Sequence, residues 1–95
     1  MLHLRFSPAI LEKLEEKHQV TRREVEQCFD NRCGEFLVDD REDHQTDPAT
    51  LWFVAPTNNE RLLKICFMFV DGNILVKSAF APNDTEIRIY ENYGK

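Results

Sequence analysis

The sequence predicts an α+β domain in which two helices near the N-terminus pack on one face of an antiparallel β-meander. Two helix-start signals lie in the first third of the chain, and strand-like stretches joined by short turns follow them. Helices that cover one face of an antiparallel sheet are a common layering, because each element must bury its apolar face. With 95 residues, the chain is expected to form a single domain, residues 1–95.

The N-terminal part is expected to contain a short strand and two helices. The stretch LHLRF alternates apolar and polar residues, which is typical of a strand. Ser7 and Pro8 are favoured at the cap and the first position of a helix. Thr21 and Glu24 have the spacing of a capping box, which predicts a second helix ending near Phe29.

Four stretches with strand character follow: EFLVD, TLWFVA, LLKICFMFV and NILVKSAF. Asp71 and Gly72 predict a two-residue hairpin turn between the last two. The C-terminal stretch NDTEIRIYENY is open between two alternatives. It fits a short helix with Ile87 and Tyr90 inside, and it also fits a strand in which Ile87 and Ile89 alternate.

The turn at Asp71-Gly72 fixes the expected register of the last hairpin, starting with Val70 opposite Asn73. One face of this hairpin is then wholly apolar and should bury against the two helices. The expected core is Ile10, Leu14, Val25, Phe29, Leu63, Ile65, Phe67, Phe69, Ile74 and Val76.

The other face of the same hairpin carries two lysines in this register. Lys64 is expected opposite Ala79 and Lys77 opposite Cys66, so the two lysines become diagonal neighbours on an exposed face. Two cations within reach of each other can bind an anion, with Arg61 able to join them. The alternative is that both lysines extend along an open sheet face with no further role.

A charged stretch, DDREDHQTDPATLWF, begins at Asp39. Asp40, Asp43 and His44 raise the prospect of a metal or acid–base cluster, and His44 could reach Lys64 and Lys77 as a general acid or base. The alternative is a solvated loop that ends at a proline. No recognised metal-ligand spacing is present, so no bound metal and no cofactor are expected. Trp52 is expected either in the core or stacked on a base.

The composition narrows the classes of function. A net charge of −5 and a pI of about 5.1 remove general attraction to nucleic acid and suit a basic protein partner. The odd number of cysteines, Cys28, Cys33 and Cys66, argues against a disulfide framework. The absence of a signal-peptide pattern and of a long apolar run predicts a cytoplasmic protein without a membrane partner.

Two stretches of the chain resemble the BrnT toxins of the RelE-like ribonuclease superfamily. KHQVTRREVEQCF is similar to their KHGV…EA…VF segment. RLLKICFMFVDGNILVKSAFAPNDTEIRIYE is similar to their third and fourth strands, followed by the SAR-x-A…E…Y ending. The likeness covers most of the chain. Small bacterial proteins labelled ADP-ribosyl-(dinitrogen reductase) hydrolase share DPPTLWF-like and RIY-like stretches, although a chain this short lacks the acidic metal-binding motifs of true ADP-ribosylhydrolases.

The BrnT resemblance implies a toxin that cuts mRNA and is neutralised by a co-encoded antitoxin. Such enzymes hold the scissile phosphate with basic side chains on the exposed sheet face, and here Arg61, Lys64 and Lys77 would serve, helped by His44. The chain departs from the pattern at Phe80, which replaces the arginine of SAR, and in its acidic net charge.

Two hypotheses follow for the function. The first is an mRNA-cleaving endoribonuclease toxin of BrnT/RelE type, with RNA as its substrate. The second is a non-catalytic binding or regulatory relative that acts through a protein partner, such as a small basic antitoxin. The overall resemblance favours the first hypothesis, and the acidic charge together with Phe80 favours the second.

Overall fold

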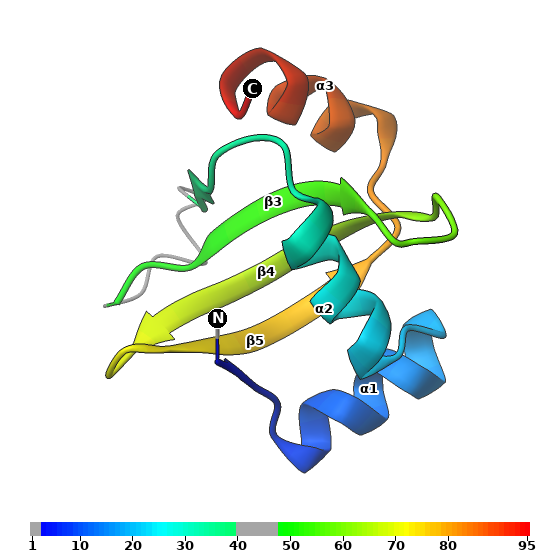
Figure 1. The fold of residues 1–95 in the computed structure, drawn as a ribbon, viewed down its shortest axis with the longest axis vertical. Coiled ribbons are helices and arrows are strands. Elements are labelled where there is room, and N and C mark those ends of the chain that lie inside the picture. The colour runs from blue at the N-terminus through cyan, green and yellow to red at the C-terminus, as the bar shows by residue number, and fades with distance from the viewer. Residues whose placement is uncertain (1–2, 40–47) are drawn as a thin grey trace.

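In the computed structural model, which describes residues 3–39 and 48–95, a five-stranded sheet lies between helices on its two faces (Figure 1). The strand order is β1-β5-β4-β3-β2; β1 runs parallel to β5, and the other neighbours are antiparallel. None of the helices in these two ranges is long and apolar enough to cross a membrane. The elements are β1 (Leu4–Arg5), α1 (Pro8–His18), α2 (Arg22–Asn31), β2 (Leu37–Val38), β3 (Leu51–Pro56), β4 (Leu62–Val70), β5 (Asn73–Phe80) and α3 (Asp84–Tyr93).

The helix starts follow the local signals in the sequence. Ser7 caps α1, and its hydroxyl accepts a hydrogen bond from the backbone N–H of Ile10. Thr21 and Glu24 form the expected reciprocal capping box at the start of α2. A second capping box, centred on Asn83, starts α3, so the open question at the C-terminus resolves as a helix.

The hairpin of β4 and β5 keeps the predicted register only near its turn. Pairing proceeds as expected as far as Phe67 opposite Val76. A register shift follows between Cys66 and Phe67, and Cys66 then pairs with Ser78. Lys77 is therefore the extra residue of a β-bulge, and its expected pairing with Cys66 was wrong.

The bulge changes which residues lie opposite Lys64. Lys64 pairs with Phe80, and the expected pairing with Ala79 was wrong. Ala79 instead pairs with Ile65, and both are completely buried. The inserted residue thus shifts the pairing of the end of β5 by one position. Because side chains alternate between the two faces of a strand, the residues beyond the bulge lie on the opposite face from the one predicted.

The core lies between the sheet and the helices α1 and α2. Rings of Phe29, Phe53 and Phe67 meet edge to face, with centroids 4.7 Å apart for Phe29–Phe53 and 5.3 Å for Phe29–Phe67. Ile10 is only partly buried against this core. Phe69 is 44% exposed near the turn of the hairpin, so its expected place in the core was wrong. The other eight residues of the expected core are buried: Leu14, Val25, Phe29, Leu63, Ile65, Phe67, Ile74 and Val76.

The third helix packs on the opposite face of the sheet. Tyr90 is buried there, 5.8 Å from the ring of Trp52, and its hydroxyl donates to the carbonyl of Glu35 at 2.8 Å. The N–H of Glu35 donates to the carbonyl of Gly94 at 2.6 Å. Position 34 lies beside this contact and requires glycine, because the Cβ of any other residue would lie only 2.5 Å from the Gly94 oxygen. The sheet face predicted to be open is therefore partly covered by α3.

Candidate functional site

Arg61, one of the predicted site residues, holds the C-terminal end of α1. Its guanidinium donates to the carbonyls of Gln19 at 2.7 Å and His18 at 2.8 Å, and it pairs with Glu24 at 3.2 Å. Burial raises the pKa of Glu24, but hydrogen bonds from Thr21 and Arg61 outweigh it and leave that pKa below its ordinary value. Arg61 thus ties the start of β4 to the junction of α1 and α2.

Lys64 lies beneath α3, and its expected exposure was wrong. Only 7% of its side chain is exposed, and its ammonium pairs with Glu86 at 2.6 Å. The same ammonium lies 4.6 Å from the ring centroid of Trp52 and 5.7 Å from that of Phe80. These contacts use the charge of Lys64 to attach α3 to the sheet.

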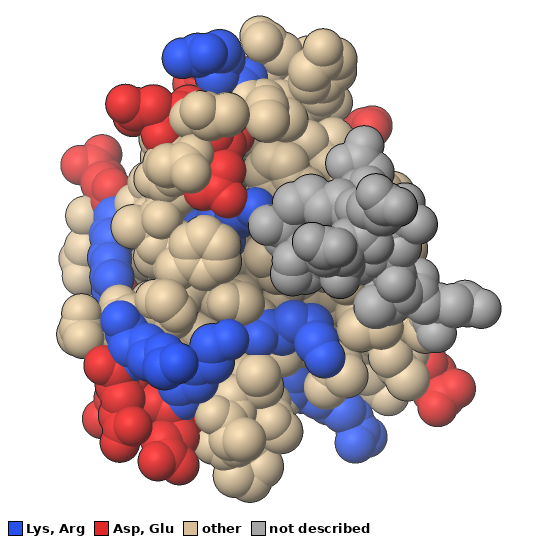
Figure 2. All heavy atoms as spheres, turned by 180° about the vertical axis from the view of Figure 1, so that it is seen from behind, with Lys and Arg blue, Asp and Glu red and all other residues tan. Residues whose placement is uncertain are grey.

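Lys77, in contrast, is exposed at the bulge of β5. The exposed Arg5 of β1 lies opposite Leu75, two residues before Lys77. Figure 2, which views the molecule from behind the orientation of Figure 1, shows Lys and Arg atoms in a band across its middle. The structure therefore does not bring Lys64 and Lys77 together as two exposed cations, and His44 lies outside the described residues.

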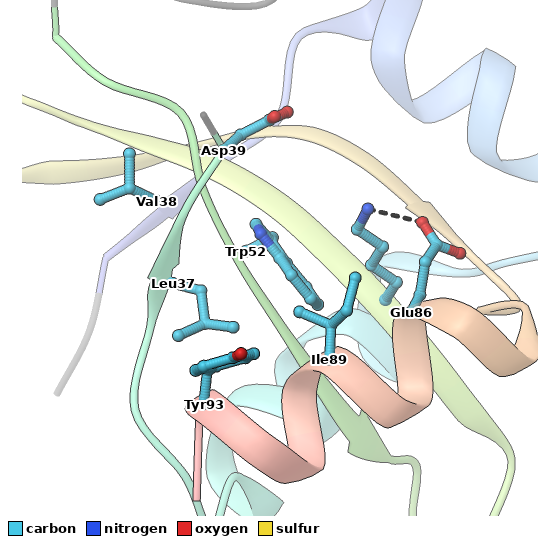
Figure 3. Close-up of a pocket in the computed structure, with 8 residues that line it drawn as sticks. Leu37, Val38, Asp39, Trp52, Glu86, Ile89 and Tyr93 are labelled. Carbon is cyan, nitrogen blue, oxygen red and sulfur yellow. Dashed lines mark hydrogen bonds and ion pairs between the residues drawn. The ribbon is translucent and has the colours of Figure 1, made fainter. Parts of the chain in front are cut away.

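A pocket of about 510 Å³ opens beside α3, and we call it the α3 groove (Figure 3). It lies between the edge strand β2, the side chain of Trp52 on β3, and one side of α3. Its volume falls within the usual range of ligand pockets. The lining residues are Leu37, Val38, Asp39, Trp52, Lys64, Glu86, Ile89 and Tyr93.

The walls of the α3 groove are largely apolar and partly exposed. Val38 and Ile89 are both exposed, and Tyr93 is 75% exposed. Figure 3 shows Ile89 and Tyr93 projecting from α3 toward Trp52 and Leu37. The groove thus has a buried floor at Trp52 and exposed apolar side chains at its rim.

The α3 groove is lined by both positive and negative groups. In the part of the chain that the structure describes, its lining contains one ammonium, Lys64, and two carboxylates, Asp39 and Glu86. Asp39 is buried at the end of β2, and Glu86 lies in the first turn of α3, where the helix dipole favours a negative charge. Among the described residues, the lining of the groove therefore contains one more carboxylate than ammonium.

The sequence contains a pattern that predicts the helix on one side of this groove, although the same stretch also fits a strand. Asn83 and Glu86 have the spacing of a capping box, which predicts a helix start. In such a helix, Glu86, Ile89 and Tyr93 are separated by three and four positions and share one face. The contribution of β2 gave no such signal, because two residues are too few for a periodic pattern.

A metal-binding cluster was one alternative for the charged stretch that begins at Asp39. Among the described residues, no three His, Cys, Asp or Glu side chains gather into a group that could hold a metal ion. Asp40, Asp43 and His44, which raised the question, lie outside that part.

Comparison with known proteins assigns no family to this chain. Neither a scan against protein-family models nor a search of curated proteins finds a significant match.

Proposed function

We propose that this protein is a non-catalytic binding protein that holds a protein partner in the α3 groove. The observation that carries the proposal is the concentration of exposed apolar side chains at this groove. In the described part of the chain, five large apolar residues are exposed, and three of them line it: Val38, Ile89 and Tyr93. Exposed apolar groups gathered at one place are typical of an interaction surface.

The shape of the α3 groove suits a segment of another protein. One wall is a helix and the other is an edge strand, with the indole of Trp52 between them. An amphipathic segment can place its apolar side chains into such a depression and leave its polar side in water. The BrnT resemblance suggests that the partner is a small basic protein, as an antitoxin would be.

The internal contacts of two basic residues also favour binding over RNA cleavage. Arg61 binds the end of α1, and Lys64 binds Glu86 beneath α3. A residue that stabilises a phosphate in the transition state must reach that phosphate. The three free cysteines agree with the cytoplasmic location that we propose for this protein.

A toxin-type endoribonuclease is the second candidate, and exposed cations on the sheet favour it. Arg5 and Lys77 are exposed on the neighbouring strands β1 and β5, where they could contact a phosphate backbone. Induced expression would then arrest growth and degrade RNA, and Lys77→Ala would weaken both effects. If growth and RNA remain unaffected, this candidate is excluded.

Affinity capture from the organism that encodes the protein tests the binding proposal. The full-length chain would carry a tag and be compared with Ile89→Asp, which places a charge on the rim of the α3 groove. Arg88→Asp is the matched control, since Arg88 is an exposed neighbour on α3 that does not line the groove. We expect the wild type and Arg88→Asp to retain one partner in stoichiometric amount, and Ile89→Asp to lose it. Equal retention by all three folded proteins would refute the proposal.

A further inference from the structure

The outer side of β2 indicates the backbone conformation of the segment that the protein binds. We propose that this segment is an extended strand, which pairs with β2, adds to the five-stranded sheet and lays apolar side chains beside the α3 groove. The inference rests on the proposed function, because it describes the partner of the same groove.

The first step concerns the direction of the backbone groups in β2. This strand lies at the edge of the described sheet, where it pairs with β3 alone. The N–H of Asp39 donates to the carbonyl of Thr50, next to β3, at 2.8 Å. In an antiparallel pair, residues that exchange hydrogen bonds alternate with residues that do not, so Leu37 faces β3 and Val38 does not. The N–H and C=O of Val38 therefore point away from the sheet, where a further strand would lie.

The second step concerns access to this edge. Val38 is 57% exposed, and within residues 3–39 and 48–95 no hydrogen bond engages its outward N–H or C=O. Exposed backbone groups of this kind are a template for pairing with a strand of another chain. The opposite edge, β1, is less suited to such pairing, because its Arg5 is exposed and a charged side chain on an edge strand discourages a further strand.

The third step concerns the side chains at the same edge. Successive side chains of a strand point to opposite faces, and both residues of β2, Leu37 and Val38, are apolar. Figure 3 shows Leu37 on the side of Tyr93 and Val38 pointing away from it. A strand added here would thus meet apolar groups on both of its faces. The segment should therefore be a short unbroken run of apolar residues, and not the three- and four-residue spacing of an amphipathic helix.

Selection from a random peptide library displayed on phage supplies a probe while the natural partner is unidentified. The library would be selected on the folded full-length protein, with removal of peptides that also bind folded Ile89→Asp. We expect the selected peptides to contain an unbroken apolar run that is rich in β-branched and aromatic residues. Apolar residues at helical spacing, or the absence of any selected peptide, would overturn the inference.

Methylation of single backbone nitrogens in a selected peptide then tests the pairing itself. Each methyl group removes one N–H donor, and only alternate N–H groups of an added strand face β2. Trp52 is the only tryptophan and lines the groove, so its fluorescence reports the binding of a peptide without tryptophan. We expect affinity to fall about tenfold at alternate positions and to change little at the positions between them. Equal losses at every position, or no loss at any position, would overturn the inference.

Matched variants of the protein examine the other side of the same hydrogen bonds. Val38→Pro removes the outward N–H without removing a bond to β3, and proline is tolerated on an edge strand. Val38→Ala keeps that N–H and shortens the side chain. We expect peptide affinity to fall about tenfold in Val38→Pro and clearly less in Val38→Ala, and the reverse order would overturn the inference.

Amide exchange measured by nuclear magnetic resonance completes the test. In the free protein, the amide of Val38 should exchange faster than that of Leu37, and the peptide should slow it. A Val38 amide that is already protected in the free protein would overturn the inference. The methylated peptides need no variant, so their result stands even if Val38→Pro fails to fold. If capture of a partner depends on Ile89 but methylation shows no alternation, the proposed function survives and the inference about strand pairing fails.

Discussion

Lys64 and Glu86 form a buried pair, and the loss of the Glu86 charge should destabilise the fold more than the loss of the Lys64 charge. In Glu86→Gln, the ammonium of Lys64 would remain beneath α3 with 7% of its side chain exposed and no opposite charge at 2.6 Å. Removing one partner of a buried pair costs about 3–5 kcal/mol, because the other charge stays desolvated. We expect Glu86→Gln to lower the free energy of unfolding by about 3 kcal/mol.

The reverse substitution should cost much less. In Lys64→Met, the remaining carboxylate of Glu86 is 19% exposed, lies in the first turn of α3 and accepts the backbone N–H of Asn83 at 2.9 Å. The dipole and the capping bond both stabilise that charge. Methionine also keeps apolar contact with Trp52, so we expect a loss of about 1 kcal/mol.

Urea unfolding followed by Trp52 fluorescence and circular dichroism measures these differences. The double variant Lys64→Met with Glu86→Gln should recover most of the stability lost in Glu86→Gln, since no unpaired charge remains. Glu26→Gln is the control, because Glu26 pairs with Arg22 at 3.8 Å on the surface and should change stability by less than about 0.5 kcal/mol. A smaller loss in Glu86→Gln than in Lys64→Met, or no recovery in the double variant, would refute this explanation of how α3 is attached.

Three further predictions follow from the packing. Phe67→Ala should lower the free energy of unfolding by about 3–5 kcal/mol, and Phe69→Ala clearly less, because Phe67 is fully buried and Phe69 is 44% exposed; urea unfolding measures both. Burial raises the pKa of the Cys28 thiol from 9.0 to about 12, so the unfolded chain releases this proton first as the pH rises. Stability should therefore fall between about pH 9 and 12 more steeply in the wild type than in Cys28→Ala, and equal slopes would contradict the burial argument. Gly34→Ala should loosen the contact with the C-terminal end of α3, seen as faster hydrogen exchange there, since the added Cβ would lie 2.6 Å from the Tyr90 hydroxyl; unchanged exchange would show that the contact does not hold the helix.

The local signals of the sequence predicted most of the fold. The capping residues Ser7 and Thr21 and the turn at Asp71-Gly72 act over a few positions, so each could be recognised from its immediate neighbours alone. The bulge at Lys77 could not be recognised, because it depends on how the far end of β5 packs against both faces of the sheet.

The candidate site was predicted less well for a similar reason. Alternation correctly placed Lys64 on the face away from α1 and α2, but exposure depends on what covers that face. The C-terminal stretch was open between helix and strand, so α3 could not be placed over Lys64. Arg61 donates hydrogen bonds to the carbonyls of His18 and Gln19, which are more than forty positions away in the chain. No local sequence pattern predicts such a contact.

Hydrogen exchange of the captured complex is the measurement that tests the central claim most directly. The claim is that a protein partner occupies the α3 groove. We predict that binding slows exchange in α3 and β2 and leaves β1 and the bulge at Lys77 unchanged. Slower exchange at β1 and Lys77 without any change in α3 would contradict the claim and would move the interaction to the exposed cations of the sheet.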